Sequence, residues 1–221
     1  MLPRVGSVSL YEARFGPADR ESKAQVWRVL CADFFQRYVP ENATVLDIGA
    51  GFCEFINHIR CGRRIALDAD PDLPRRAAAG VQVHCGTGDD LGWLDSASVD
   101  VVFASNVFEH FHTKAAVLRA LEEARRVLRP GGRILILQPN IRFLPGAYWD
   151  FFDHHLPFTE RSMCEGLRLA GFEIEEVRPR FLPYTTKSAL PSWPVLVRAY
   201  LRLPLFHRLL GKQMFVVAGK R

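Results

Sequence analysis

The chain has 221 residues, is 48% hydrophobic and carries a net charge of +5, a composition that predicts one globular domain with a sizeable core. The mild basic excess permits nucleic acid or an anionic surface as a partner without requiring either, and we expect no nucleic-acid partner. Since no apolar run reaches 18 residues, the sequence predicts no transmembrane helix.

The five cysteines are irregularly spaced, and no two of them form a CxxC pair. This pattern predicts reduced thiols in a cytoplasmic protein and gives no reason to expect a zinc site. The N-terminus also lacks the long apolar run of a signal peptide.

In chain order, the expected elements begin with a loose arm over residues 1–20. A helix over 22–38 follows, because the apolar side chains there recur at helical spacing. Short apolar strands then alternate with helical segments, and the second strand leads into a short helix that ends at Gly80. The strands are expected at 44–48, 64–67, 81–85, 99–104, 133–137, 172–177 and 213–218, and the longer helices at 53–60, 113–128 and 159–170.

This alternation of nearly all-apolar strands with helices predicts an α/β fold, in which a parallel sheet is covered by helices on both faces. Residues 179–212 are instead rich in proline, aromatic side chains and spaced arginines, and we interpret them as an insertion or appendage. The expected organisation has four parts: an N-terminal arm and helix (1–40), a ligand-binding core (41–178), the appendage (179–212) and the last strand of the core sheet (213–221).

A glycine turn follows the first strand in the stretch "VLDIGAGFCEF", residues 45–55. Such a turn lets a ligand approach the backbone closely. A phosphate-binding P-loop would need a lysine and then serine or threonine, whereas Phe52, Cys53 and Glu54 come next. A dinucleotide fingerprint would need a third glycine at the position that Glu54 holds.

Two acids beside the turn point to a different ligand. Asp47 lies at the end of the strand, two residues before Gly49, where a carboxylate can meet a cationic ligand. Asp68 ends the second strand, where an acid in this architecture binds ribose hydroxyls. The pair indicates a nucleoside ligand with cationic groups, such as the sulfonium and ammonium of S-adenosylmethionine. The structural alternatives are a turn capped by Asp47 and a helix capped by Asp68.

Four stretches in one order, "VLDIGAGFCEF", "IALDADP", "VDVVFASNVFEHF" and "EEARRVLRPGGRILIL", resemble class I S-adenosylmethionine-dependent methyltransferases over about residues 40–140. The resemblance implies a Rossmann-like fold with a mostly parallel seven-stranded sheet whose last strand is antiparallel. It implies S-adenosyl-L-methionine as the cofactor and the following binding residues: Asp47, Gly49, Ala50, Gly51, Asp68, Ala69, Thr87, Asp89, Ser105 and Asn106.

Within that set, the resemblance assigns the two glycines to the methionine moiety, Asp68 to the ribose and Ala69 to the adenine. Members of the family often have an acid that contacts the adenine amino group. Thr87 holds the aligned position in this chain, and Asp89 follows two residues later.

Methyl transfer from a sulfonium is an in-line displacement that depends on holding donor and acceptor together, and an oxygen acceptor usually also loses a proton. By the resemblance, Ser105, Asn106 and His110 belong to the loop after the fourth strand, which faces both cofactor and substrate. His110 is therefore a candidate general base, with a packing or helix-capping histidine as the alternative. We interpret Glu109 as a solvated residue.

The stretch "AYWDFFDHHLPF", residues 147–158, follows the fifth strand at the same ligand edge. His154 and Asp153 are candidate catalytic residues near the acceptor, and a lid packed on the core is the alternative interpretation. No metal is expected, because this Asp-His-His run alone is not a spaced set of ligands. The side chains expected to wall an acceptor pocket are Tyr148, Trp149, Phe151 and Phe152.

Two further segments suggest contacts outside the core. The N-terminal arm of this chain carries Tyr11, Arg14 and Phe15. In related methyltransferases an N-terminal segment often closes over the cofactor, and a simple docked tail is the alternative. Residues 190–212 place basic and apolar side chains at helical spacing, as in helices that lie in a membrane interface. An ordinary packed surface helix is the alternative, and the expected location is cytoplasmic, with peripheral contact to the inner face of the membrane.

Other stretches, including "YEARFG", "YWDFFDHH" and "RFLPYTTKS", resemble bacterial methyltransferases that are associated with polysaccharide or glycan assembly. The resemblance implies O-methylation of a small-molecule or glycan-type acceptor. The alternatives are an NAD-dependent oxidoreductase and a non-catalytic S-adenosylmethionine-binding protein. An RNA methyltransferase is a further alternative, although this chain has "SNVF" where many base-methylating relatives have "NPPY".

Overall fold

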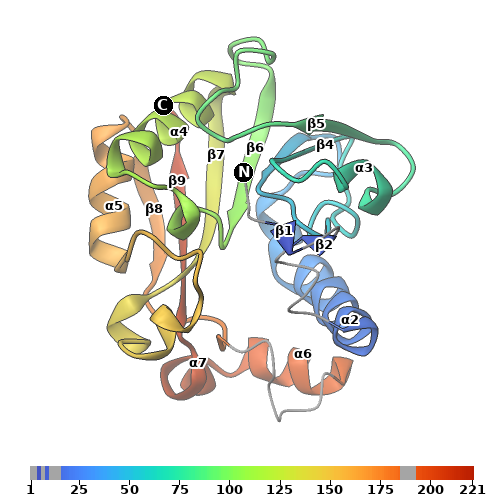
Figure 1. Cartoon of the computed structure of the whole chain (residues 1–221), viewed down its shortest axis with the longest axis vertical. Helices are drawn as coiled ribbons and strands as arrows, with labels where there is room; N and C mark the ends of the chain where they lie inside the picture. The colour runs from blue at the N-terminus through green and yellow to red at the C-terminus, as the bar shows by residue number, and fades with distance from the viewer. Residues whose placement is uncertain (1–3, 6–7, 10–15, 185–192) are drawn as a thin grey trace.

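The structure, a computed structural model, describes residues 4–5, 8–9, 16–184 and 193–221 (Figure 1). Tyr11, Arg14 and Phe15 lie outside these ranges. The closure of the N-terminal arm over a cofactor therefore stays a prediction.

A seven-stranded sheet forms the centre of the fold (Figure 1). Neighbouring strands pair parallel except for β9, which runs antiparallel to both of its neighbours, β7 and β8. This arrangement confirms the predicted α/β fold with a mostly parallel sheet and an antiparallel last strand. In spatial order the strands are β5 (Val81–Cys85), β4 (Arg63–Asp68), β3 (Thr44–Ile48), β6 (Val99–Ser105), β7 (Leu128–Pro139), β9 (Gln213–Gly219) and β8 (Glu173–Arg178).

Helices cover both faces of the sheet (Figure 1). The helices α4 and α5 pack on one face, and α2 packs on the other. The helical elements are α2 (Pro17–Asp33), η1 (Phe35–Tyr38), α3 (Leu73–Arg76), η2 (Phe108–His110), α4 (Lys114–Val127), η3 (Ile141–Phe143), η4 (Ala147–Asp150), α5 (Glu160–Leu169), α6 (Pro194–Arg202) and α7 (Pro204–Leu210), where η marks a 3₁₀ helix. Two short strands, β1 (Arg4–Val5) and β2 (Val8–Ser9), pair antiparallel near the N-terminus.

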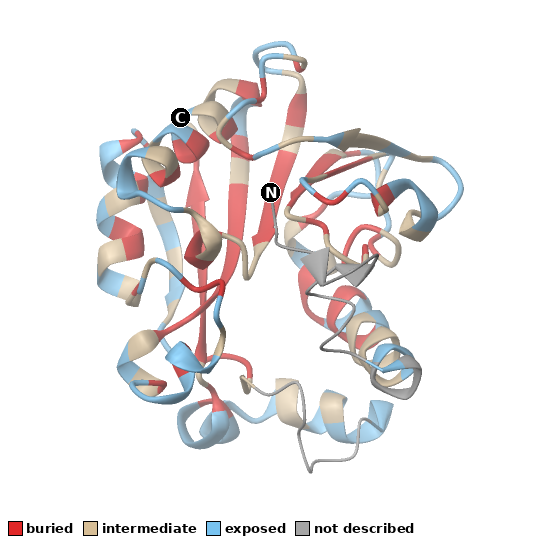
Figure 2. Cartoon of the chain, in the orientation of Figure 1, coloured by how far each residue is buried: buried red, intermediate tan, exposed pale blue. Residues whose placement is uncertain are grey.

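The strand β3 shows why the sheet needs helices on both faces. Successive side chains of a strand point to opposite faces. Leu46 and Ile48 belong to the core cluster under α4 and α5, while Val45 belongs to the cluster under α2. Figure 2 shows the central strands buried along most of their length. This two-sided burial explains the nearly continuous apolar runs of the sequence.

The segment after the glycine turn differs from the prediction, because residues 53–60 form a series of turns rather than a helix. Gly51 and Cys53 have positive φ angles of 54° and 61°, and this left-handed backbone interrupts a right-handed helix where it would begin. The first helix also begins earlier than predicted, at Pro17, and ends at Asp33.

The segment 179–212 returns the chain to the carboxyl end of β7. Gln213, the first residue of β9, pairs with Pro139, the last residue of β7. On the way, α6 packs against α2, and Arg198 forms a salt bridge with Asp33 at 2.8 Å. The helices α6 and α7 therefore lie at the edge of the sheet where β3, β6 and β7 end (Figure 1).

The composition predicts reduced thiols and no transmembrane helix. All five cysteines are free in the structure, as the irregular spacing predicts. In the described part of the chain, no helix has both the length and the apolar character that crossing a bilayer requires.

Candidate active site

The glycine turn ties the end of β3 to the end of β4. The backbone N–H groups of Gly49 and Ala50 both donate to the carbonyl of Leu67, at 2.8 and 3.0 Å. Gly49 has a φ of +69°, and a Cβ added there would lie 2.5 Å from a methyl carbon of Val107. Both the backbone angle and the lack of space therefore require glycine at this position.

Asp47 is a buried carboxylate at the end of β3, with only 2% of its surface exposed. Burial raises the pKa of this carboxyl well above its ordinary value, and the neighbouring Glu54 and Asp68 raise it further. Among the described residues, none forms a salt bridge with Asp47. A buried acid among other acids favours a cationic ligand, so this part of the site fits the ammonium and sulfonium groups of S-adenosylmethionine.

Asp68 is fixed by backbone donors on both sides of its carboxylate. One oxygen accepts a hydrogen bond from the N–H of Gly51 at 2.8 Å, and the other accepts from the N–H of Asp70 at 2.9 Å. Burial raises the pKa of Asp68, while these two hydrogen bonds oppose the shift. Helix capping does not explain Asp68, because Asp72 holds the N-cap position of α3. Ala69, the residue assigned to the adenine, is exposed beside Asp68.

Arg76 organises the same turn and was not predicted from the sequence. Its guanidinium forms a salt bridge with Asp70 at 3.0 Å and donates to the carbonyl of Gly51 at 3.3 Å. The same group lies 4.9 Å from the centre of the Phe52 ring, in a cation–π contact. Arg76 thus links the glycine turn to the loop after β4, a contact that becomes visible only once the two strands are paired.

The loop after β5 comes close to the other two strand ends. The N–H of Gly86 donates to the carbonyl of Asp68 at 2.9 Å, and a Cβ on Gly88 would lie 2.7 Å from a carbon of Ile48. Thr87 is exposed between them, so it lies at the edge where the resemblance places it. Asp89 instead binds Arg119 of α4 at 3.2 Å. The contact of either side chain with adenine stays a prediction.

The loop after β6 carries three of the predicted residues, Ser105, Asn106 and His110. Asn106 has a positive φ of 51°, and its N–H donates to the carbonyl of Leu137 on β7 at 2.8 Å. Its amide nitrogen lies 3.3 Å from the hydroxyl of Ser105. Its side-chain oxygen is buried and has no hydrogen-bond partner among the described residues. A buried acceptor at this position is open to a donor from a ligand or a water.

Glu109 is fully buried, so its interpretation as a solvated residue is wrong. One carboxylate oxygen accepts a hydrogen bond from the amide of Gln138 at 2.7 Å, and the other has no partner among the described residues. Burial raises the pKa of this carboxyl, whereas the neighbouring His110 lowers it. The sequence missed Glu109 because Gln138, its partner on β7, lies 29 positions away.

His110 and Asp153 are brought together, as the prediction of a shared active site requires. Nδ1 of His110 lies 2.9 Å from the carbonyl oxygen of Asp153 and 3.4 Å from its carboxylate. A proton on Nδ1 is held by these oxygens, which leaves Nε2 as the nitrogen that can accept a proton. The backbone N–H groups of His155 and Leu156 both donate to the carbonyl of Glu109, at 2.8 and 3.1 Å, and fix the two loops together.

His154 belongs to the loop after β7, next to the loop that carries His110, and is also buried. Its ring centre is 5.2 Å from that of His110, and the ring of Phe151 stacks on it with a distance of 5.0 Å between the ring centres. The hydroxyl of Tyr184 lies 3.5 Å from Nε2 of His154. Tyr184 therefore brings the segment 179–184 to the site, a contribution that was not predicted from the sequence.

The aromatic residues expected to wall a pocket divide into two pairs. Tyr148 is buried and donates a hydrogen bond to the carbonyl of Leu156, and Phe151 stacks on His154. Trp149 and Phe152 are 53% and 87% exposed, so their place in the wall of a pocket stays a prediction.

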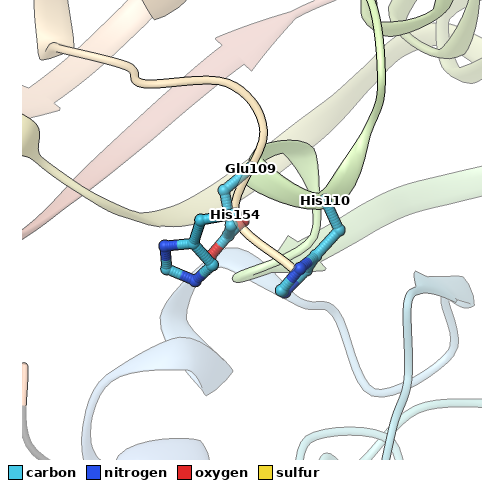
Figure 3. Close-up of side chains that lie close together, drawn as sticks. All are labelled: Glu109, His110 and His154. Atoms are coloured by element: carbon cyan, nitrogen blue, oxygen red, sulfur yellow. The ribbon is translucent and has the colours of Figure 1, made fainter. Parts of the chain in front are cut away.

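Glu109, His110 and His154 could together hold a metal ion, since each offers one ligand atom within 4.8 Å of the others (Figure 3). Neighbouring ligands of a metal with bonds of about 2.1 Å lie only about 3–3.4 Å apart. The three side chains would have to move closer together to bind one ion. In the present arrangement they are suited to holding and moving protons.

Residues 46–136 match the family described as "Methyltransferase domain". The matched residues run from β3 to β7 and contain the glycine turn, both acids beside it and His110. This part of the chain is similar to a methyltransferase domain.

Two curated relatives match parts of the chain. A protein of Mycolicibacterium smegmatis named "Probable S-adenosylmethionine-dependent methyltransferase" is 40% identical over 85 residues, which are 38% of this chain and 32% of that protein. The "Uncharacterized protein MJ0638" of Methanocaldococcus jannaschii is 30% identical over 132 residues, 59% of this chain and 55% of that protein. The chain therefore spans about a third of the first relative and just over half of the second.

Solved methyltransferase structures share the whole fold. A chain from the complex of the Haloferax volcanii Trm112 methyltransferase activator with a methyltransferase gives a TM-score of 0.68 at 20% identity, over 96% of this chain and 97% of that one. A SAM-dependent methyltransferase from Archaeoglobus fulgidus gives 0.64 at 18% identity, over 96% and 98%. At these identities the likeness shows the fold. Together with the domain match, the comparisons support a class I S-adenosylmethionine-dependent methyltransferase.

Proposed function

We propose that this protein transfers the methyl group of S-adenosylmethionine to an oxygen atom of a small-molecule or glycan-type acceptor. The observation that carries the proposal is the position of the His110–Asp153 pair. His110 follows β6 and Asp153 follows β7, at the same sheet edge as the glycine turn, which Val107 of the His110 loop contacts. A cofactor site and a proton acceptor thus share one edge of the sheet, where ligands of open α/β folds bind.

The cofactor half of the site would use Asp47, Asp68 and the glycine turn. S-adenosylmethionine, when bound, supplies an electrophilic methyl group on a sulfonium. The buried carboxylate of Asp47 offsets the positive charge of that ligand. Asp68 presents a carboxylate that is already oriented by Gly51 and Asp70, so little rotational freedom is lost when it accepts hydrogen bonds from ribose hydroxyls.

The acceptor half would supply a general base. Nε2 of His110 accepts the hydroxyl proton while the acceptor oxygen attacks the methyl carbon, and the departing sulfur keeps the electron pair of the broken bond. Asp153 stabilises the positive imidazolium that results and keeps the ring in one orientation. His154 would border the acceptor, with Tyr184 beside it.

The alternatives are less consistent with the same contacts. An NAD-dependent oxidoreductase would place a negatively charged pyrophosphate near Asp47 and Glu54, which are both acids. A non-catalytic S-adenosylmethionine-binding protein would have no use for a histidine oriented by a buried aspartate at the ligand edge.

Two measurements test the proposal. Isothermal titration calorimetry with S-adenosylmethionine and with NAD should give binding for the first ligand alone. An assay of S-adenosylhomocysteine release should then give turnover with one class in a panel of sugars, lipid-linked glycans and phenolic metabolites. Binding of NAD in place of S-adenosylmethionine would contradict the proposal, and cofactor binding without turnover on any acceptor would favour the non-catalytic alternative.

We also propose that the protein is located in the cytoplasm.

A further inference from the structure

The helices α6 and α7 expose an unusual number of apolar side chains. Eight of the twelve large apolar residues that are exposed in the described part of the chain lie within residues 193–210. Exposed apolar clusters of this kind mark interaction sites. We call these eight the α6–α7 surface: Trp193, Val195, Leu196, Leu203, Leu205, Phe206, Leu209 and Leu210.

This exposure does not come from a failure of the two helices to pack. Val197, Tyr200 and Leu201 of α6 pack against the core cluster under α2, and Tyr200 donates a hydrogen bond to the carbonyl of Phe181. His207 of α7 is buried, with Nε2 2.9 Å from the carbonyl oxygen of Tyr200. The helices thus bury one apolar side against the protein and present a second apolar side to the surroundings, as the mostly exposed ribbons of α6 and α7 show in Figure 2.

Residues 193–212 carry basic side chains and no acidic ones. Residues 193–212 contain four of the 29 lysines and arginines of the chain and none of its 24 acids, so the remainder of the chain is nearly neutral, with 25 basic and 24 acidic residues. Arg198 is paired with Asp33, while Arg202 and Arg208 are exposed. Apolar side chains flanked by cations match an anionic lipid surface, whose interior accepts the former and whose headgroups attract the latter.

The α6–α7 surface also lies at the edge of the fold that carries the candidate active site. Gln213, three residues after α7, pairs with the last residue of β7. Tyr184, which precedes α6 in the chain, reaches His154. The exposed aromatic side chains of Trp149 and Phe152 belong to the segment that supplies Asp153 and His154.

We propose that the α6–α7 surface docks on an anionic lipid bilayer, and that the acceptor is an amphiphile held in that bilayer by its apolar part. The docking stands on exposure and charge alone, whereas the acceptor class rests on the proposed methyltransferase function. Docking places the protein at the membrane face and brings the candidate active site next to the headgroups.

Vesicle cosedimentation tests the docking with the full chain. Vesicles of equal parts phosphatidylglycerol and phosphatidylcholine should carry the protein into the pellet, and pure phosphatidylcholine vesicles should carry much less. Raising the salt concentration should release the protein, because the attraction of the cations is screened. The double variants Leu205→Ser/Leu209→Ser and Arg202→Glu/Arg208→Glu should each weaken the partitioning at least about tenfold.

A matched control on α5 separates docking from a general effect of the substitutions. Leu169 is 71% exposed and the side chain of Arg161 is 84% exposed, so Leu169→Ser/Arg161→Glu makes one substitution of each kind on another face. This control should bind vesicles like the unmodified protein. Equal partitioning of control and α6–α7 variants, or no binding of the unmodified protein to anionic vesicles, would overturn the proposal. A dimer that dissociates in the α6–α7 variants, without any vesicle binding, would assign the surface to a second copy of this chain and would overturn it as well.

The acceptor class is tested by S-adenosylhomocysteine release with a lipid-linked glycan in vesicles and with its water-soluble headgroup alone. Turnover should be at least about tenfold faster with the vesicle-borne acceptor, and the α6–α7 variants should lose that advantage. Calorimetric binding of S-adenosylmethionine by the same variants should stay unchanged. Loss of cofactor binding in the unmodified protein would refute the proposed function, whereas equal turnover on both acceptors would refute the acceptor class alone.

Discussion

The two halves of the candidate active site are held in place by different kinds of contact. Around the glycine turn, backbone groups make most of the hydrogen bonds, including those from Gly49 and Gly51. Around His110, both side chains and backbone groups join two loops that are far apart in the sequence, including the side chains of Asp153 and His154. The cofactor half is therefore built from local backbone geometry, and the acceptor half depends on the pairing of separate loops.

Because different contacts hold the two halves in place, the two halves can be tested separately. Substitutions at the cofactor half should change binding of S-adenosylmethionine, whereas substitutions at the acceptor half should change turnover with binding retained. A variant that moved both quantities together would show that the halves are not independent.

Asp68→Ala is expected to have the largest effect, a loss of at least about 2–3 kcal/mol of cofactor-binding free energy. The carboxylate would bind the ribose, and it also holds the N–H groups of Gly51 and Asp70. Calorimetry should find no measurable binding. Asp95→Ala, which removes an exposed acid, is the control and should bind normally. Unchanged affinity in the Asp68→Ala variant would show that Asp68 only stabilises the turn and does not bind the ribose.

His110→Ala is expected to lower turnover by about 10²–10⁴-fold while cofactor binding is retained, because the variant lacks the proton acceptor of the acceptor half. S-adenosylhomocysteine release, measured beside calorimetry, checks both parts. The control is His112→Ala, which removes an exposed histidine two residues further on. Full activity of the His110 variant would remove this residue as the base.

Asp47→Asn is expected to raise the free energy of unfolding without cofactor by about 1–2 kcal/mol at neutral pH, and to weaken cofactor binding. Burial holds the pKa of Asp47 in the folded state well above its ordinary value of 3.8. The folded state therefore binds this proton more tightly than the unfolded state, so the stability from Asp47 is complete below the unfolded pKa and is lost as the pH rises through the folded pKa.

Urea unfolding at several pH values checks this prediction. Stability of the unmodified protein should fall more steeply than that of the Asn variant as the pH rises above about 4, and the two curves should run parallel once Asp47 is ionised in both states. Parallel curves over the whole range would mean that the charge of Asp47 costs the fold nothing.

A divalent-metal chelator is expected to have the smallest effect, with turnover unchanged. The ligand atoms of Glu109, His110 and His154 are spread over distances up to 4.8 Å, and Nδ1 of His110 already contacts Asp153. Loss of turnover with the chelator, restored by zinc or manganese, would show that this cluster is a metal centre. The acceptor half of the site would then bind a metal ion rather than supply a general base.

Features that depend on residues adjacent in the chain were predicted better than contacts between residues far apart in the sequence. The strand pattern, the parallel sheet and the turn at Gly49 follow from apolar runs and glycines that are adjacent in the chain. Placing Asp47 and Asp68 at one sheet edge needed only the rule that parallel strands end together.

Partners that meet only in the folded chain could not be predicted. Glu109 reads as a surface acid beside a histidine until Gln138 and the backbone of Leu156 enclose it. Arg76 acquires its role only from Asp70 and Gly51. The helix predicted after the turn failed for a related reason, since its apolar spacing does not reveal the left-handed backbone.

The missing side chain of Gly49 lets the loop after β6 pack directly on the glycine turn. Val107 fills the space where a Cβ would stand, and three residues later the same loop carries His110. An in-line displacement is sensitive to the separation of its reacting atoms. In the proposed reaction, that separation would depend on the direct contact between the backbone of Gly49 and Val107. Enlarging either partner would push the loop that carries His110 away from the glycine turn.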